Sequence, residues 1–179
     1  MTTPEGTVIN INSAGGWTTD RIYQLLKDNG LNSTIGPLLT VNVRDDVSSQ
    51  VTTSAGTTNG RYTYFRANIY LKGVNSTMNT SPDAAVGHEF GHAWTLYYLY
   101  IAQQGDWSSY LSARGIAGDP RLNTTYEWTD REIIADDYRL LFGSDLAISE
   151  RPHLNTDIPD PRNVPGLKQF FQTTWMTPK

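Results

Sequence analysis

Two histidines stand four residues apart near the middle of the chain, with an acidic residue directly after the first. His88, Glu89 and His92 fit the pattern H-E-x-x-H. Side chains at positions i and i+4 of a helix lie on one face, so both imidazoles can reach one zinc ion. Glu89 lies between them and can point at a water molecule on that ion. The spacing therefore predicts a metal site with hydrolytic chemistry.

A second pair of acidic residues at the same spacing follows downstream. Glu132 and Asp136 flank the apolar stretch 133–135, so a helix places both carboxylates on one face. A catalytic zinc takes three protein ligands, and a ligand histidine usually donates its other N–H to a carboxylate. We expect Glu132 as the third ligand and Asp136 as that acceptor. The alternative is a solvated acidic helix edge that pairs with Arg131 and Arg139.

Two features of the sequence restrict the kind of metal site. The chain has no cysteine, so its ligands must come from His, Asp and Glu. The extended motif H-E-x-x-H-x-x-G-x-x-H requires a glycine and a third histidine where this chain has Thr95 and Tyr98. The metzincin type of zinc site is therefore excluded.

With these residues the chain resembles the gluzincin metallopeptidases, and among them the anthrax lethal factor-like group, to which the secreted Pro-Pro endopeptidases are related. The resemblance rests on 88–93 (HEFGHA) and 132–142 (EIIADDYRLLF), and more loosely on the helix after 164–165. It implies an endopeptidase that acts on a peptide or protein substrate with one zinc ion per chain. The implied roles are zinc ligands for His88, His92 and Glu132, general base for Glu89, and oxyanion stabilisation for Tyr126.

The third histidine and two other functions leave alternatives open. His153, in a proline-rich stretch, is either a second oxyanion donor or a surface-loop residue. The chain could be a zinc-stabilised binding module without turnover, although Glu89 argues against that. It could also be a zinc amidase that acts on cell-wall peptide. A digest of a peptide library separates these functions.

Composition excludes several classes of protein. With 179 residues, of which 38% are hydrophobic and 18% charged, the chain is long enough for one core and too apolar for disorder. A net charge of −4 without a Lys or Arg run excludes nucleic acid as a partner. We expect no membrane span, and no signal peptide in this sequence. The Thr-, Ser- and Asn-rich surface composition indicates a secreted bacterial protein.

The order of strand and helix signals indicates an α+β fold. Alternating apolar residues predict strands over 7–12, 39–43 and 62–71, and the segment 45–60 is read as a loop or hairpin. We expect 66–72 to be the edge strand that binds substrate backbone. Capping and breaker residues predict helices over 19–29, 82–103, 107–113, 130–142 and 164–175, with Ser81 as an N-cap.

Together with the resemblance, which implies a zincin-like fold, these signals predict a single catalytic domain over residues 1–179. Its sheet lobe, about 1–92, would be a small twisted mixed sheet with a backing helix above the active-site helix. Its helical lobe, about 93–179, would supply Glu132.

Overall fold

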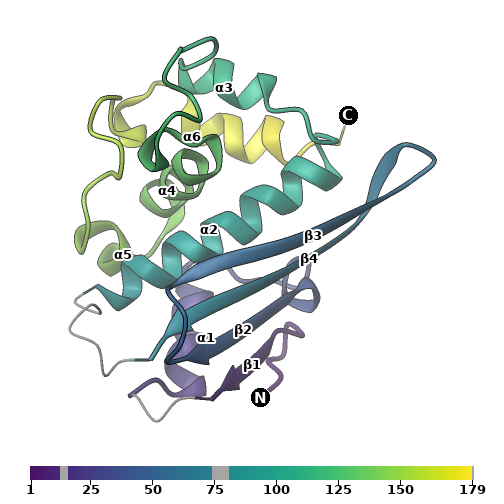
Figure 1. The fold of residues 1–179 in the computed structure, drawn as a ribbon, viewed down its shortest axis with the longest axis vertical. Coiled ribbons are helices and arrows are strands. Elements are labelled where there is room, and N and C mark those ends of the chain that lie inside the picture. Colours follow the sequence, from purple (N-terminus) through teal and green to yellow (C-terminus); the bar gives the residue numbers. More distant parts are fainter. Residues whose placement is uncertain (13–15, 74–80, 179) are drawn as a thin grey trace.

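The computed structural model describes residues 1–12, 16–73 and 81–178, and it is an α+β structure in which strands precede most helices (Figure 1). The first part contains β1 (Val8–Ile11), α1 (Thr19–Asp28), β2 (Leu39–Arg44), β3 (Gln50–Thr58) and β4 (Arg61–Lys72). The second part contains α2 (Pro82–Ile101), α3 (Ser108–Arg114), α4 (Asp130–Phe142), α5 (Asp145–Ser149) and α6 (Leu167–Phe170). Short 3-10 turns span Gly36–Leu38, Tyr126–Trp128 and Pro161–Asn163, and a π-helical turn spans Phe171–Trp175. No helix among the described residues is long and apolar enough to cross a membrane.

The strands form one mixed sheet in the order β1-β2-β4-β3. β1, β2 and β4 run parallel, whereas β3 pairs antiparallel with β4 and forms an outer edge. The prediction that 66–72 is an edge strand is therefore wrong, because β4 is paired on both sides. The edge comes from 45–60, the segment read as a loop or hairpin. Its Thr and Ser side chains suit a strand with solvent on one side.

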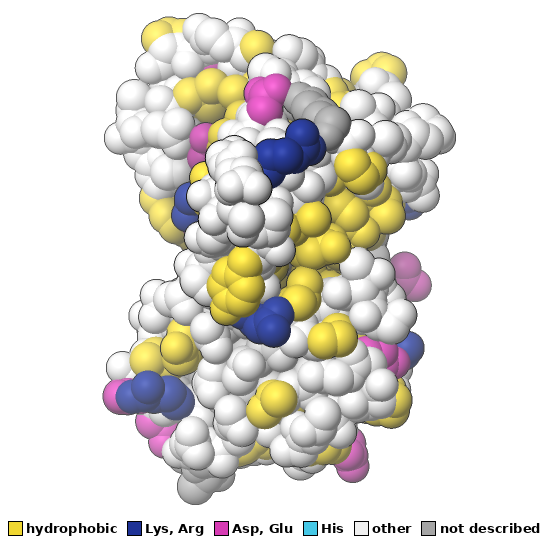
Figure 2. Space-filling view, turned by 90° about the vertical axis from the view of Figure 1, so that its right-hand side faces the viewer, with side chains coloured by type: hydrophobic (Ala, Val, Ile, Leu, Met, Phe, Trp, Pro, Cys, Tyr) yellow, Lys and Arg dark blue, Asp and Glu magenta, His cyan; other side chains and the backbone are white. Residues whose placement is uncertain are grey.

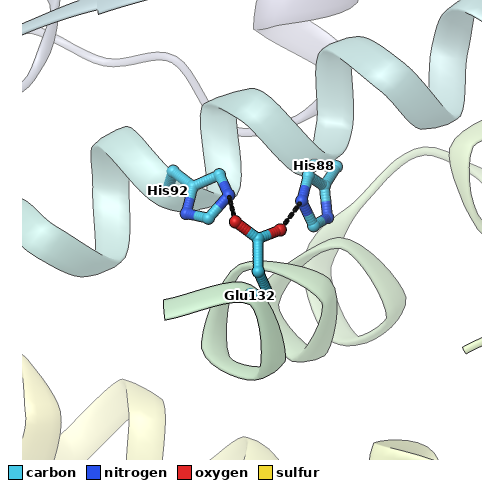
Figure 3. A group of neighbouring side chains, drawn as sticks. All are labelled: His88, His92 and Glu132. Atoms are coloured by element: carbon cyan, nitrogen blue, oxygen red, sulfur yellow. Dashed lines mark hydrogen bonds and ion pairs between the residues drawn. The ribbon is translucent and has the colours of Figure 1, made fainter. Parts of the chain in front are cut away.

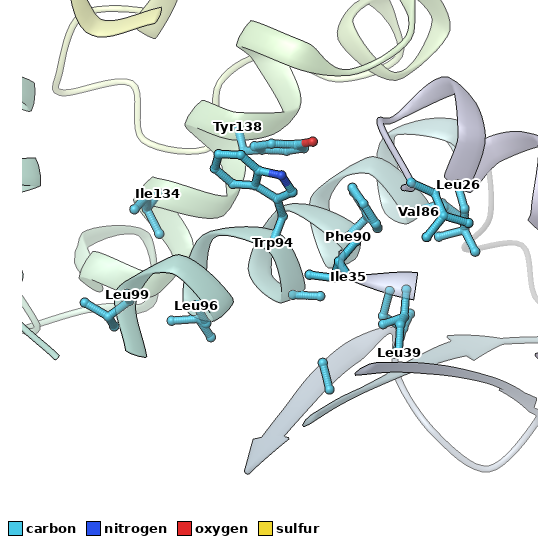
Figure 4. Close-up of a cluster of buried hydrophobic side chains, with 14 of the residues drawn as sticks. Leu26, Ile35, Leu39, Val86, Phe90, Trp94, Leu96, Leu99, Ile134 and Tyr138 are labelled. Carbon is cyan, nitrogen blue, oxygen red and sulfur yellow. The ribbon is translucent and has the colours of Figure 1, made fainter. Parts of the chain in front are cut away.

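The core lies between one face of the sheet and the helices. Ile9, Val41 and Ile69 are fully buried, while their sequence neighbours on the sheet are more exposed, as expected for a sheet with one covered face. Helix α2 contacts α1, β4 and α4, so it runs between the sheet and the C-terminal helices (Figure 1). Figure 4 shows the apolar side chains that fill this space: Leu26, Ile35, Leu39, Val86, Phe90, Trp94, Leu96, Leu99, Ile134 and Tyr138.

The start of α2 is held by a residue far along the chain. Ser81 occupies the predicted N-cap position, but its side chain makes no capping bond, and Ser81 Oγ lies 3.5 Å from the carbonyl oxygen of Glu150. The free N–H of Ala84 is instead bound by Glu150 Oε2 at 2.8 Å. A carboxylate at a helix N-terminus also complements the helix dipole. The end of α5 thus fixes the helix that carries both histidines.

The final predicted helix is shorter than expected and changes its geometry. It begins at Leu167 rather than at residue 164, because Gly166 takes a left-handed conformation with φ of 77°. Gln103 then anchors the chain end by donating from Nε2 to the carbonyl oxygens of Thr174, Trp175 and Thr177. These bonds join the C-terminal segment to the residues that follow α2.

Candidate metal centre

Two elements bring the predicted ligands together. His88 and His92 project from α2, and Glu132 projects from α4 between them (Figure 3). His88 Nε2 lies 3.0 Å from Glu132 Oε2, and His92 Nε2 lies 3.3 Å from Glu132 Oε1. One potential ligand atom from each of the three residues lies within 4.8 Å of the others. This group could hold a metal ion.

A close helix crossing places Glu132 under the histidines. A Cβ atom on Gly91 would lie 2.5 Å from the carbonyl oxygen of Ala135, a distance that real Cβ atoms essentially never show. Only glycine therefore lets α2 and α4 approach this closely. Gly91 precedes His92, and Ala135 lies one turn after Glu132. The motif itself thus contains the contact that sets the distance between ligands on different helices.

Asp136 lies behind His88, on the face of α4 that carries Glu132. Asp136 Oδ1 is 3.5 Å from His88 Nδ1, the ring nitrogen opposite the one that faces Glu132. Arg139 Nε donates to the same oxygen at 2.7 Å, and the backbone N–H of Leu154 donates to Asp136 Oδ2 at 2.7 Å. Asp136 is 3% exposed and Arg139 is 1% exposed, so this pair is not a solvated edge.

Arg139 connects this carboxylate to the segment after α5. Its guanidinium also donates to the carbonyl oxygens of Ala147, Arg151 and Pro152, at 2.6, 3.1 and 3.0 Å. One buried side chain therefore fixes both Asp136 and the backbone that passes beside the site.

In the metal-free group, burial and the interactions among the site residues shift their pKa values. Burial lowers the pKa of His88, but hydrogen bonds to Asp136 and Glu132 outweigh it and raise that pKa to about 10. Burial works against ionisation of Glu132, yet hydrogen bonds from His88 and His92 hold its pKa well below the usual value. Burial lowers the pKa of His92. Burial raises the pKa of Glu89 to about 7, partly opposed by the charge on His88.

Two grooves meet at Glu89 and Tyr126, and both are lined by these residues and by Ser48 and Ser49. The first groove, of about 270 Å³, includes His88 and continues past Asp136. The second groove, of about 580 Å³, includes His92 and Glu132 and follows 50–53 at the start of β3. No histidine is visible on the face toward which the β3–β4 hairpin points (Figure 2).

Tyr126 lies beside the ligand group, as the resemblance implies, although it is 59% exposed. Partial burial and a hydrogen bond to Glu132 raise the pKa of its hydroxyl well above the usual value. A protonated phenol that lines both grooves can donate a hydrogen bond to a bound oxyanion.

His153 is buried behind the site and does not line either groove. Its Nδ1 lies 2.6 Å from the carbonyl oxygen of Asn155, and its Nε2 lies 3.4 Å from Asp137 Oδ1. This position does not match a surface-loop histidine, and it gives no support to a role as an oxyanion donor.

Sequence reasoning missed the side chains that complete the first groove. Ser48, Ser49, Lys72 and Arg151 come from three separate segments and belong to no motif. Their common location depends on the sheet order and on the backbone path after α5, and no local spacing in the sequence predicts either.

Comparisons with known proteins found no match: no protein-family model, no curated protein and no solved structure matches the chain.

Proposed function

We propose that this chain is a zinc-dependent endopeptidase of the gluzincin type, with a zincin-like arrangement of sheet and active-site helix. His88, His92 and Glu132 would hold the zinc ion, and Glu89 would be the general base. The observation that carries the proposal is the position of Glu132 between the two histidines of an H-E-x-x-H helix, beside grooves that also expose Glu89.

The donor set fits zinc better than the other common metal ions. Ca²⁺ and Mg²⁺ prefer oxygen ligands, whereas two imidazole nitrogens and one carboxylate oxygen are a typical set for catalytic Zn²⁺. Three protein ligands leave a fourth position open. His88 lines the first groove and His92 and Glu132 line the second, so an ion held by them would be accessible from the grooves.

The residues around this position have complementary tasks. A bound zinc ion would lower the pKa of water toward neutrality and polarise a substrate carbonyl. Glu89 would accept the proton of the attacking water and pass it to the leaving amine; in the metal-free structure, burial raises its pKa to about 7. Tyr126 donates its O–H to the oxyanion. Asp136 orients His88 through Nδ1.

The free edge of β3 supports a peptide substrate. β3 pairs with β4 on one side only, and its first residues, 50–53, line the second groove. An extended peptide can pair with such an edge through its backbone, which also brings a peptide carbonyl toward Glu89.

The test is one digest of a mixed peptide library, read by mass spectrometry. Zinc-loaded wild type should cleave peptides, whereas Glu89→Gln should retain zinc and lose nearly all activity, because an amide cannot accept the proton. Tyr126→Phe should reduce turnover roughly 10- to 1,000-fold, since one oxyanion donor is lost. Glu127→Gln, an exposed substitution of the same kind outside both grooves, is the matched control and should be fully active.

Two results would contradict the proposal. Full activity in Glu89→Gln would exclude the general-base mechanism. A wild-type protein that holds zinc and cleaves nothing would instead support the zinc-stabilised binding module.

A further inference from the structure

The first groove has an excess of positive charge. Its lining includes three cationic side chains, Lys72, Arg139 and Arg151, and two carboxylates, Glu89 and Asp136. Arg139 and Asp136 pair with each other at 2.7 Å. Lys72 and Arg151 thus face one remaining carboxylate, that of Glu89.

Neither cation is paired in the part of the chain that the structure describes. The Lys72 ammonium and the Arg151 guanidinium form no ion pair or hydrogen bond there, although most other arginines are paired with Asp. Arg151 and Glu89 nevertheless line the same groove.

The backbone at both cations is held in place. The carbonyl oxygen of Lys72, at the end of β4, accepts a hydrogen bond from Trp17 Nε1 at 3.0 Å. The carbonyl oxygen of Arg151 accepts one from the buried Arg139 at 3.1 Å. Both side chains therefore start from backbone positions that are held in place.

The rest of the lining suits a small polar group. Ser48 and Ser49 supply hydroxyl donors, and Ala84 and Ala85 have short side chains that leave the groove open. A volume of about 270 Å³ is below that of a typical small-molecule pocket, so it fits about one amino-acid side chain. Hydroxyls and two unpaired cations together form a site in which donors outnumber the one carboxylate that is left, that of Glu89.

We infer that the first groove binds a carboxylate of the substrate, one or two residues from the bond to be cleaved, with Lys72 and Arg151 as its specificity determinants. This inference rests on the proposed function, because it places a peptide across Glu89. The carboxylate can come from an Asp or Glu side chain or from the C-terminus of the peptide.

The probes are octapeptides, acetylated and amidated at their ends, that carry Glu or Gln at one position and are otherwise matched. Binding to zinc-loaded Glu89→Gln protein is measured by fluorescence anisotropy, so it does not depend on turnover. We expect Glu to bind about tenfold more tightly than Gln at one position, as for a charge-assisted hydrogen bond. A third peptide, with a free C-terminus and no internal acid, tests whether the C-terminus supplies the bound carboxylate instead of a side chain.

The variants Lys72→Met and Arg151→Gln, combined in the same background, should remove this preference. Arg151→Gln retains the backbone carbonyl that Arg139 binds, so the fold should persist, and circular dichroism with zinc content verifies it. Arg66→Gln is the matched control, because Arg66 is exposed and lies outside both grooves, and it should keep the preference.

Equal binding of all acidic and neutral peptides, including no binding of any, would overturn the inference, as would a preference that survives in the double variant. Cleavage by wild type without acid preference would reject the inference and leave the proposed function standing. A preference for acidic peptides in a protein that cleaves nothing would support the inference and reject the proposed function.

Discussion

Two neighbouring residues of α4, Asp136 and Asp137, belong to two buried charge clusters with different surroundings. The metal cluster contains His88, His92, Glu132 and Asp136, and it opens into both grooves. The closed cluster contains Asp137 with Tyr110, Arg114 and His153, and none of these four residues lines either groove.

The closed cluster pairs its opposite charges internally, although Arg114 Nε and Nη1, Asp137 Oδ1 and His153 Nε2 have no hydrogen-bond partner among the described residues. Tyr110 donates to Asp137 Oδ2 at 2.8 Å, and Arg114 Nε lies 2.8 Å from the same oxygen. The side chains of Arg114 and Asp137 are both fully buried, so water cannot replace a lost partner. In the metal cluster, the two histidines and Glu132 pair with one another in the metal-free structure. A bound ion would replace these contacts. Histidine and carboxylate side chains therefore stabilise the fold when they are enclosed, and they can exchange partners with a ligand when they face a groove.

Loss of a ligand should have the largest effect on the metal cluster. Glu132→Gln should reduce zinc affinity by orders of magnitude, because an amide oxygen carries no charge for the ion. The metal-free protein should lose some unfolding free energy as well, because the charged Glu132 is the partner of both histidines there. A competition titration with a chelator measures the affinity, with Glu127→Gln as control. Unchanged affinity would remove Glu132 from the ligand set.

The closed cluster should respond in the opposite way. Arg114→Met should lower the unfolding free energy by about 3–5 kcal/mol, because it leaves the Asp137 carboxylate buried without its cation. Zinc stoichiometry of the folded variant should stay at one per chain. Urea denaturation and elemental analysis provide both quantities. A loss of zinc without a loss of stability would contradict the division into two clusters.

The crossing of α2 and α4 connects both clusters. A substitution there should therefore change both the unfolding free energy and the zinc affinity. Gly91→Ala should cost roughly 1–3 kcal/mol of unfolding free energy, because the added methyl group overlaps the Ala135 carbonyl. Zinc affinity should fall with it, since α4 moves away from α2. Gly56→Ala is the control, because its Cβ would make an ordinary 3.6 Å contact. Equal stability of the two variants would show that the crossing does not require glycine.

The smallest effect distinguishes the two neighbouring aspartates. Asp136→Asn should weaken zinc binding roughly 10- to 100-fold, because His88 loses the charged acceptor at Nδ1. Asp137→Asn should leave zinc affinity unchanged and lower stability instead. Isothermal titration of both variants under identical conditions compares them. The reverse order of affinities would mean that the predicted helix phase is wrong.

The sequence predicted that His88, His92 and Glu132 lie together, because the spacing within each helix is local information. The i, i+4 spacing in α2 and again in α4 places each pair on one face, and Gly91 within the motif permits the crossing. The strands at residues 8–11, 39–44 and 61–72 were also recognisable, because one sheet face is covered and apolar residues alternate.

The remaining features depend on non-local pairing. β3 is mostly Thr, Ser and Gly, with Val51 and Ala55 as its apolar residues, so its sequence resembles a loop, and its ladder with β4 makes it a strand. Glu150 caps α2 from a distant segment, so the local signal at Ser81 misidentified the capping residue. The closed cluster had no motif, since α3 and α4 each contribute a single residue to its ion pair, Arg114 and Asp137, with no recognisable spacing.

The most direct test of the three proposed zinc ligands is anomalous diffraction from crystals of the zinc-loaded protein, recorded on both sides of the zinc absorption edge. We predict one zinc peak per chain, bonded to Nε2 of His88, Nε2 of His92 and a carboxylate oxygen of Glu132, at about 2.0–2.2 Å. A peak elsewhere, for example at His153, or no peak at this group would contradict the account.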